Sequence, residues 1–370
     1  MIKTVFILGA GASRAAGGPL MYDFIDNAMR IYRKGEGGWA DKHFENILSA
    51  RKKLQHAFVK SRIDLDNIEN FFATCEMASL IGKLSNLDQK TVESLPESLR
   101  YMIMRTLEQA ILFDINGNDK YIPSPYPYDT FTDLLIELQK EKDISPLCVI
   151  NLNYDLCFDY ALSMKNFKPE YGLGKSNPKQ LNTIPHYKVH GSLNWIQEKN
   201  SIKANLVKPL LMERYWERLG FNRGREYPID TMELIFGPHK WGERIFPDPV
   251  IVPPTWNKGW YQEQLKTVWR NASEALSSAE NIFVLGYSLP ASDQFFRSFW
   301  SLSTISDNIV DKFWLFDPST EDNIIERYTS FLGPAIIERG KFRFERQKFT
   351  GAIRSIAQYY GFEVNNLVDR

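Results

Sequence analysis

The segment Val5-Phe6-Ile7-Leu8-Gly9-Ala10-Gly11-Ala12-Ser13-Arg14 decides the fold of this 370-residue chain. A run of apolar residues passes directly into glycine, alanine and serine, which is typical of a buried parallel strand that turns into a helix. Gly9 and Gly11 have no side chains, so a phosphate group can approach the main-chain N–H groups of such a turn. Arg14 occupies the place of the third glycine of the usual dinucleotide-binding fingerprint, and a tight turn that binds nothing is therefore the alternative.

Later segments repeat the alternation of apolar strands and amphipathic helices. Strands are predicted at 147–150, 282–285, 313–316 and 341–349, and helices at 21–29, at 156–162, from about 291, and at 353–360. Strands separated by helices predict an α/β fold, a Rossmann-like doubly wound parallel sheet.

The stretch between the first two predicted strands is mostly helical. Stripes of apolar residues at 68–75 and 131–138 predict helices there, so about 40–140 is expected to be a large helical insertion. A stretch at about 164–260 is rich in Trp, Pro and Gly without a clear period, and we expect it to form loops and pocket walls. The whole of 1–370 is predicted to be a single domain.

Composition and cysteine usage exclude several classes of protein. Forty-five basic residues balance forty-five acidic ones, which argues against a protein that wraps a polyanion. The three cysteines, Cys75, Cys148 and Cys157, contain no C-x-x-C pair, so no zinc ribbon or thioredoxin-type site is expected. Cys148 and Cys157 have apolar neighbours and are predicted to be buried. No signal peptide or membrane-length apolar run is found, and we expect a cytoplasmic protein.

Small or polar residues follow each predicted strand, where ligands bind in open α/β sheets. Asn153 and Asp155 follow the strand at 147–150, and extended backbone would project both side chains to the same side. Capping of the next helix is the alternative, more so for Asp155 than for Asn153. His190 lies in Val-His-Gly-Ser at 189–192, where a near-neutral imidazole suits a general base, although a structural histidine is the alternative. His43 and His56 are interpreted as surface residues.

Two later turns offer similar groups. Gly286 and Ser288 combine bare backbone with a hydroxyl, as the first glycine turn does. Asp317 ends the strand at 313–316, where a carboxylate suits the hydroxyls of an adenosine ribose; a simple turn with Pro318 is the alternative. Arg14 is interpreted either as a phosphate neutraliser or as a surface residue.

Five of these segments together resemble, in chain order, the motifs of the sirtuin-like superfamily. They are Gly-Ala-Gly-Ala-Ser at 9–13, Asn-Leu-Asn-Tyr-Asp at 151–155, Val-His-Gly-Ser at 189–192, Gly-Tyr-Ser-Leu-Pro at 286–290 and Phe-Asp-Pro-Ser at 316–319. The chain departs from the protein-deacylating sirtuins, because it cannot supply their four-cysteine zinc ribbon and has Leu152 where they have glutamine. With its helical insertion, and with the segments at 66–76 and 252–258, it looks more like the bacterial sirtuin-like domains of antiviral defence.

The resemblance implies an NAD⁺ glycohydrolase that releases nicotinamide and ADP-ribose, with NAD as substrate and no zinc. It further implies antiphage defence by NAD depletion, homo-oligomers and a defence partner such as a DNA-translocating ATPase, while the lack of a membrane-length apolar run predicts no membrane association. Catalysis is expected from Asn153 on the water or ribose, His190 as base, and Asp155 on the nicotinamide amide or the loop. Cofactor binding is expected at Gly9, Ala10, Gly11, Ala12, Ser13, Gly286, Ser288 and Asp317. The alternatives are an NAD-dependent protein deacylase or ADP-ribosyl transferase, an oxidoreductase, and a non-catalytic NAD or ADP-ribose sensor.

Overall fold

The computed structural model describes residues 1–56, 63–113, 124–173, 182–197, 207–209, 227–228, 249–252, 262–306, 308–320 and 323–363. Among these residues, seven strands form one sheet in the order β12-β11-β10-β1-β3-β5-β4, and every adjacent pair is parallel. The strands are β1 (Thr4–Leu8), β3 (Leu147–Asn151), β4 (Lys168–Glu170), β5 (Thr183–Lys188), β10 (Asn281–Leu285), β11 (Lys312–Phe316) and β12 (Phe342–Glu345). The predicted α/β fold with a parallel sheet is therefore confirmed.

The strand β1 lies at the point where the strand order reverses. In the sheet, β3, β5 and β4 follow β1 on one side, and β10, β11 and β12, which come later in the chain, follow on the other side. In a doubly wound sheet, this reversal opens a crevice beyond the carboxyl ends of the strands. The turns that follow β1, β3 and β10 all lie at that edge.

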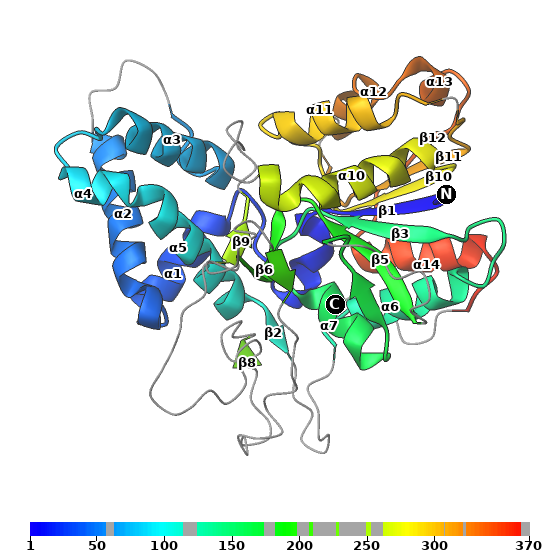
Figure 1. The fold of residues 1–370 in the computed structure, drawn as a ribbon, viewed down its shortest axis with the longest axis horizontal. Coiled ribbons are helices and arrows are strands. Elements are labelled where there is room, and N and C mark those ends of the chain that lie inside the picture. The colour runs from blue at the N-terminus through cyan, green and yellow to red at the C-terminus, as the bar shows by residue number, and fades with distance from the viewer. Residues whose placement is uncertain are drawn as a thin grey trace.

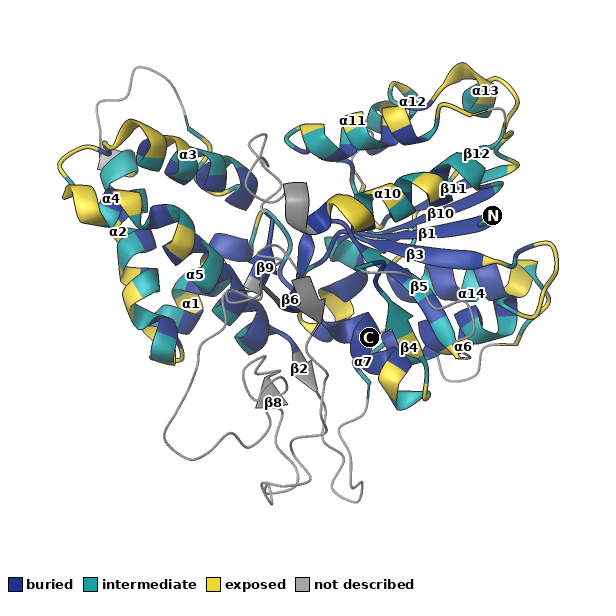
Figure 2. Cartoon of the chain, viewed as in Figure 1, coloured by how far each residue is buried: buried dark blue, intermediate teal, exposed yellow. Residues whose placement is uncertain are grey.

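Helices cover both faces of the sheet (Figure 1). One face carries α10 (Gln262–Ser278), α11 (Gln294–Ser303), α12 (Asn323–Thr329) and α13 (Pro334–Ile337), and the other carries α6 (Tyr128–Leu138), α7 (Cys157–Met164) and α14 (Phe349–Tyr359). Successive β1 residues alternate between the two cores: Val5 and Ile7 pack with α10 and α11, and Phe6 and Leu8 pack with α6 and α14. Figure 2 shows the central strands as the most deeply buried part of the molecule.

A separate group of helices lies beside the sheet, between β1 and β3 in the sequence (Figure 1). It contains α1 (Phe24–Arg33), α2 (Asp41–His56), α3 (Ile68–Ile81), α4 (Gln89–Glu93) and α5 (Leu95–Ala110). The apolar stripe of α3, with Phe71, Phe72 and Cys75, is buried as predicted. The predicted helical insertion between the first two strands of the sheet is thus confirmed.

The segment after the first glycine turn differs from the prediction. The turn leads into a short 3-10 helix, η1 (Ala10–Ala16), and α1 begins only at Phe24, so Pro19 and Met21 precede it. Gly17 ends η1 in the left-handed region with a φ of 92°, and a Cβ there would lie 2.3 Å from the carbonyl oxygen of Ala110. Because the end of α5 comes so close, only glycine fits at position 17. The chain changes direction at this residue. The helix expected from about 291 begins at Gln294, because the Asp293 carboxylate caps it.

The prediction of loops over about 164–260 is wrong for β4 and β5, which are strands of the main sheet, and short antiparallel strands occur in the same stretch. β6 (Gly191–Gln197) pairs with β7 (Val207–Pro209) and β9 (Pro249–Ile251), and β2 (Leu112–Phe113) pairs with β8 (Tyr227–Pro228). Most of 164–260, including His239 and most of the 252–258 segment, lies outside the described residues. Within the described part of the chain, no helix combines the length and apolarity that a membrane span requires.

Candidate functional site

A cavity of about 630 Å³ lies at the carboxyl edge of the sheet. Turns that follow β1, β3, β5, β10 and β11 form its polar side. Nine of the predicted site residues line it: Ala10, Gly11, Ser13, Asn153, Asp155, His190, Gly286, Ser288 and Asp317. The two others, Gly9 and Ala12, belong to the first turn without lining the cavity. Residues from five strand ends thus meet in one space, of a size usual for small-molecule sites.

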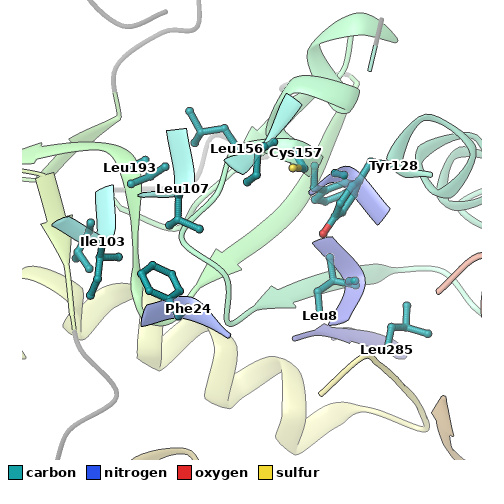
Figure 3. Close-up of a cluster of buried hydrophobic side chains, with 14 of the residues drawn as sticks. Leu8, Phe24, Ile103, Leu107, Tyr128, Leu156, Cys157, Leu193 and Leu285 are labelled. Carbon is teal, nitrogen blue, oxygen red and sulfur yellow. The ribbon is translucent and has the colours of Figure 1, made fainter. Parts of the chain in front are cut away.

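Helices of the insertion form the apolar side of the same cavity. Phe24 of α1 and Ile103 and Leu107 of α5 line it, and Figure 3 shows these three side chains gathered in one cluster. Phe72 of α3 contributes a further apolar surface. The cavity therefore has one wall of polar strand ends and another of aliphatic and aromatic side chains.

The glycine turns after β1 and β10 interlock through their backbones. The Gly11 N–H donates to the Gly286 carbonyl at 2.9 Å, and the Gly9 N–H donates to the Leu285 carbonyl at 3.0 Å. A Cβ on Gly9 would lie 2.5 Å from the Gly286 oxygen, and one on Gly286 would lie 2.5 Å from the Ala12 nitrogen. Gly286 also has a φ of 65°. Packing thus requires these glycines, and the Gly11 N–H is already bonded within the protein.

Ser13 joins the first turn to the turn after β3. Its Oγ donates to Oδ2 of Asp155 at 2.6 Å and lies 2.8 Å from the Tyr128 hydroxyl, and Nδ2 of Asn153 donates to it at 3.3 Å. Since the one Ser13 hydroxyl proton goes to Asp155, Tyr128 is the donor in its own bond. The same Asn153 Nδ2 donates to the Gly9 carbonyl at 2.8 Å. The side-chain bonds of Asn153 therefore reach the glycine turn and not the start of α7.

Extended backbone is not what brings Asn153 and Asp155 together. The strand β3 ends at Asn151, whose Oδ1 accepts from the Asn153 N–H at 2.9 Å, so that premise of the prediction is wrong. The two side chains meet instead on Ser13. Oδ1 of Asp155 accepts from the N–H of Cys157, the first residue of α7, at 3.0 Å, which confirms the expected bond to that helix. Both carboxylate oxygens of Asp155 therefore bond the protein itself.

Burial keeps the hydroxyl and thiol groups around this cluster protonated. It raises the pKa of Tyr128 well above its usual value, and the nearby Asp155 carboxylate adds to the shift. The pKa of the Cys157 thiol is raised in the same way, by burial and then by Asp155. Cys157 is thus a buried thiol rather than a nucleophile, as its apolar neighbours predict.

His190 lies in the tight turn between β5 and β6. Its carbonyl accepts from the Val252 N–H at 2.8 Å, and its side chain is buried within the cavity lining. Gly191 follows with a φ of 86°, and a Cβ there would lie 2.0 Å from the Val250 carbonyl oxygen. The imidazole centroid is 6.3 Å from that of the Tyr154 ring. Close packing against β9 therefore fixes the backbone that presents this imidazole.

The turn after β10 is held by two tyrosine hydroxyls. Tyr287 donates to Oδ2 of Asp293 at 2.7 Å, and Tyr328 donates to the Tyr287 carbonyl at 2.6 Å. Burial, followed by the nearby Asp293 carboxylate, raises the pKa of Tyr287 well above its usual value. At the next strand end, Oδ1 of Asp317 accepts from the Ser319 N–H at 2.8 Å, which is the turn expected as its alternative role. Both turns still border the cavity.

Three charged residues that line the cavity, Glu69, Asp293 and Arg327, are not among the predicted site residues. Glu69 of α3 is buried there and accepts from the Ser292 hydroxyl, which joins the helical group to the loop after β10. Arg327 of α12 also lines the cavity and bonds the carbonyl and side chain of Asn323. Glu69 falls in the 66–76 segment that the sequence singles out, whereas no motif marks Arg327. Arg14, in contrast, pairs with Asp23 at 2.6 Å and lies outside the cavity lining.

The remaining histidine and cysteine predictions have mixed outcomes. The surface prediction is wrong for His43, which is half-buried with its Nδ1 3.2 Å from the Ser98 hydroxyl, and the side chain of His56 lies outside what the structure describes. Helix packing of α2 on α5 buries it. Cys148 and Cys157 are buried as predicted. Among the described residues, no group of three His, Cys, Asp or Glu side chains is arranged to hold a metal ion.

Comparison with known proteins gives structural similarity only. No protein-family model matches the sequence, and no curated protein matches it. Solved structures that align include "Structure of Sir2Tm bound to a propionylated peptide", at 12% identity and a TM-score of 0.37 over 98% of this chain and 94% of that one. "Sir2 bound to acetylated peptide" aligns at 12% identity and 0.39, over 98% and 94%. A Sir2 homologue mutant in complex with ADP-ribose aligns at 12% identity and 0.42, over 98% and 95%.

Proposed function

We propose that the protein is an NAD⁺ glycohydrolase, which cleaves NAD with water to nicotinamide and ADP-ribose. The observation that carries this proposal is the cavity in which Asn153, His190 and the two glycine turns meet at the switch point of the sheet. An amide, an imidazole and bare backbone at one crevice suit hydrolysis of a dinucleotide better than they suit a purely structural core.

Binding of NAD is assigned to the strand ends after β1, β10 and β11. The backbone at Gly11 and Gly286 allows the phosphates to approach closely, and Ser288 supplies a hydroxyl for them. Asp317 supplies a carboxylate for a ribose hydroxyl. The bond between the Gly11 N–H and Gly286 leaves phosphate binding to other groups of the turn. The volume of about 630 Å³ lies within the range of cofactor sites.

Catalysis is assigned to the strand ends after β3 and β5. Nicotinamide leaves as a neutral ring when the bond between its nitrogen and C1′ of the ribose breaks, and positive charge develops on the sugar. The neutral amide of Asn153, oriented by its bonds to Gly9 and Ser13, positions the water or a ribose hydroxyl without adding charge. Water oxygen bonds to C1′, and His190 takes the water proton as general base. Asp155 holds the loop through Ser13 and α7.

Water is the proposed acceptor rather than an acyl-lysine. The three cysteines of the chain are too few for the four-cysteine zinc ribbon that the deacylating sirtuins carry beside the acyl-lysine groove. A single domain, antiphage defence by NAD depletion, homo-oligomers and a partner such as a DNA-translocating ATPase remain proposals supported by the motif resemblance.

Incubation of the purified protein with NAD alone tests the proposal. Chromatography is expected to detect nicotinamide and ADP-ribose in equal amounts. Asn153→Ala and His190→Ala are each expected to lower the rate by about 100-fold while the melting temperature shows that the variants remain folded. Asn86→Ala, at an exposed position between α3 and α4, is the matched control and keeps the wild-type rate.

Other outcomes distinguish the alternatives. Undiminished cleavage by both variants would show that the catalytic assignment is wrong. Nicotinamide release only with an acylated peptide or another acceptor present would favour a deacylase or transferase. Formation of NADH would favour an oxidoreductase. Stabilisation by ADP-ribose without turnover, at every protein concentration tested, would favour a non-catalytic sensor.

A further inference from the structure

A fully buried ion pair lies beneath the turn that carries Asn153. Lys188, the last residue of β5, and Asp159 of α7 both have no exposed surface, and Nζ of Lys188 lies 3.2 Å from Oδ2 of Asp159. Burial of a lysine is costly unless the ammonium is paired and hydrogen-bonded. The other contacts of Lys188 therefore indicate its role in the structure.

The other contacts of Lys188 go to main-chain carbonyls of the catalytic turn. Its Nζ donates to the carbonyl of Tyr154 at 3.3 Å and to that of Asp155 at 2.5 Å. An ammonium has three N–H donors, and here it meets three acceptors: two adjacent carbonyls and one carboxylate oxygen. Lys188 thus pairs the Asp155 carbonyl, as a buried backbone acceptor requires, and supplies a donor to the Tyr154 carbonyl as well.

Asp159 is held in its charged form by several donors. Burial alone would raise the pKa of this carboxyl, but Lys188, His186 and the Tyr171 hydroxyl outweigh burial and hold it well below its usual range. Nδ1 of His186 lies 3.5 Å from Oδ1, which also accepts from the Tyr171 hydroxyl. The position of the Lys188 ammonium is therefore fixed by a charged and immobilised partner.

Lys188 also connects the two catalytic turns. Its backbone ends β5 two residues before His190, and its side chain bonds the turn that contains Asn153. The carbonyl of Tyr154 additionally accepts from the Leu193 N–H of β6 at 3.1 Å, so residues on both sides of the turn that carries His190 bond the same oxygen. A change in the ammonium would thus alter the separation of Asn153 from His190.

We propose that Lys188 is a positioning residue, which sets the spacing between Asn153 and His190 by binding the carbonyls of residues 154 and 155. The inference rests on the proposed NAD cleavage for its kinetic readout. Lys188 touches neither substrate nor water in this role. It holds the amide and the imidazole at the separation that the reaction needs, because a displacement of about 1 Å at reacting groups costs about 100-fold in rate.

The test is the double variant Lys188→Met/Asp159→Asn. Replacing lysine alone would leave a buried carboxylate without its cation and threaten folding, whereas the double variant removes both charges at nearly constant volume. The expected result is a folded protein whose melting temperature falls by only a few degrees as the Asp155 carbonyl loses its donor, a kcat for nicotinamide release lowered by about 100-fold, and a KM for NAD changed by less than about threefold. Lys3→Met is the matched control, since Lys3 bonds the Lys142 carbonyl on the surface at the other end of β1.

Hydrogen exchange provides a readout that does not depend on turnover. Amides at 153–157 and 189–193 are expected to exchange faster in the double variant, while those of β10 and β11 keep their wild-type rates. A folded double variant with wild-type kcat, or with unchanged exchange in these two segments, would overturn the inference. If the wild type does not cleave NAD, the proposed function fails, and the exchange result alone decides whether Lys188 holds the turns together.

Discussion

The two halves of the carboxyl edge of the sheet are built in different ways. After β1 and β10, the turns pack through bare backbone, with Gly11 bonded to Gly286 and no room for a Cβ on either glycine. After β3 and β5, the turns are held by side chains, through the Ser13 cluster and the ammonium of Lys188. The contact that joins the two turns is therefore made by backbone in the first half and by buried side chains in the second.

This difference indicates which perturbations each half tolerates. A backbone contact fails when any atom is added, whereas a side-chain network fails when a donor or acceptor is removed. The backbone half is suited to hold the phosphates of a ligand close to the main chain. The side-chain half is suited to orient an amide and an imidazole. The following predictions test the two halves of the edge separately.

The largest effect is expected from Gly286→Ala, in the backbone half. Its Cβ would meet the Ala12 nitrogen at 2.5 Å and the residue has a φ of 65°. The combined collision and left-handed strain should lower the free energy of unfolding by about 4 kcal/mol, measured by urea denaturation. Gly35→Ala is the control, because Gly35 has a φ of 72° with no atom within 4 Å of its added Cβ, and it should cost about 1 kcal/mol. Equal losses in the two variants would show that the turns do not interlock.

A smaller loss is expected from Ser13→Ala, in the side-chain half. Asp155 would lose a buried hydrogen bond to a charged oxygen, and Tyr128 and Asn153 would lose their shared acceptor. The free energy of unfolding should fall by about 2 to 3 kcal/mol in urea denaturation. Ser79→Ala removes an exposed bond to the Glu93 carbonyl and should cost less than about 0.5 kcal/mol. A Ser13 variant as stable as this control would contradict the proposed network.

The bond between the turn after β3 and β9 should contribute less. The Tyr154 hydroxyl donates to the Val252 carbonyl at 2.9 Å, and Tyr154→Phe should lower the free energy of unfolding by about 1 kcal/mol. Tyr32→Phe removes an exposed hydroxyl 3.5 Å from Glu45 and should leave the melting curve almost unchanged. A stabilised Tyr154 variant would mean that this bond does not secure the turn.

The smallest expected effect is a pH dependence contributed by His186 of β5. Burial lowers the pKa of this imidazole from 6.5, and Asp159 only partly opposes the shift. The unfolded chain therefore binds a proton more readily than the folded one, so the contribution of His186 is present above pH 6.5 and is lost as the pH falls below it. His186→Asn removes this titration, and melting temperatures on both sides of pH 6.5 should fall less steeply with acid than those of the wild type. Parallel curves for the two proteins would contradict a neutral buried His186.

Several features of the site could be predicted from local pattern. The apolar run before Gly9 specifies a buried strand, and polar residues directly after the later strands mark the edge where they meet. Lys188 and Arg327 carry no such signal, since one charged residue at the end of a strand or within a helix usually faces solvent. The 3-10 helix after the first turn was also missed, because Gly17 is required by contact with Ala110 rather than by its neighbours in sequence.

By itself, the sequence determined five of the seven strands of the sheet, the helical stretches between them and the polar residues that follow the strands. Only the tertiary structure decided that Gly11 meets Gly286, that Ser13 joins Asn153 to Asp155, and that Lys188 lies beneath their turn. Periodicity and turn chemistry act over a few neighbouring residues, so they are readable along the chain. These contacts join segments more than a hundred residues apart or buried charges whose partners no local pattern specifies, and packing alone selects them.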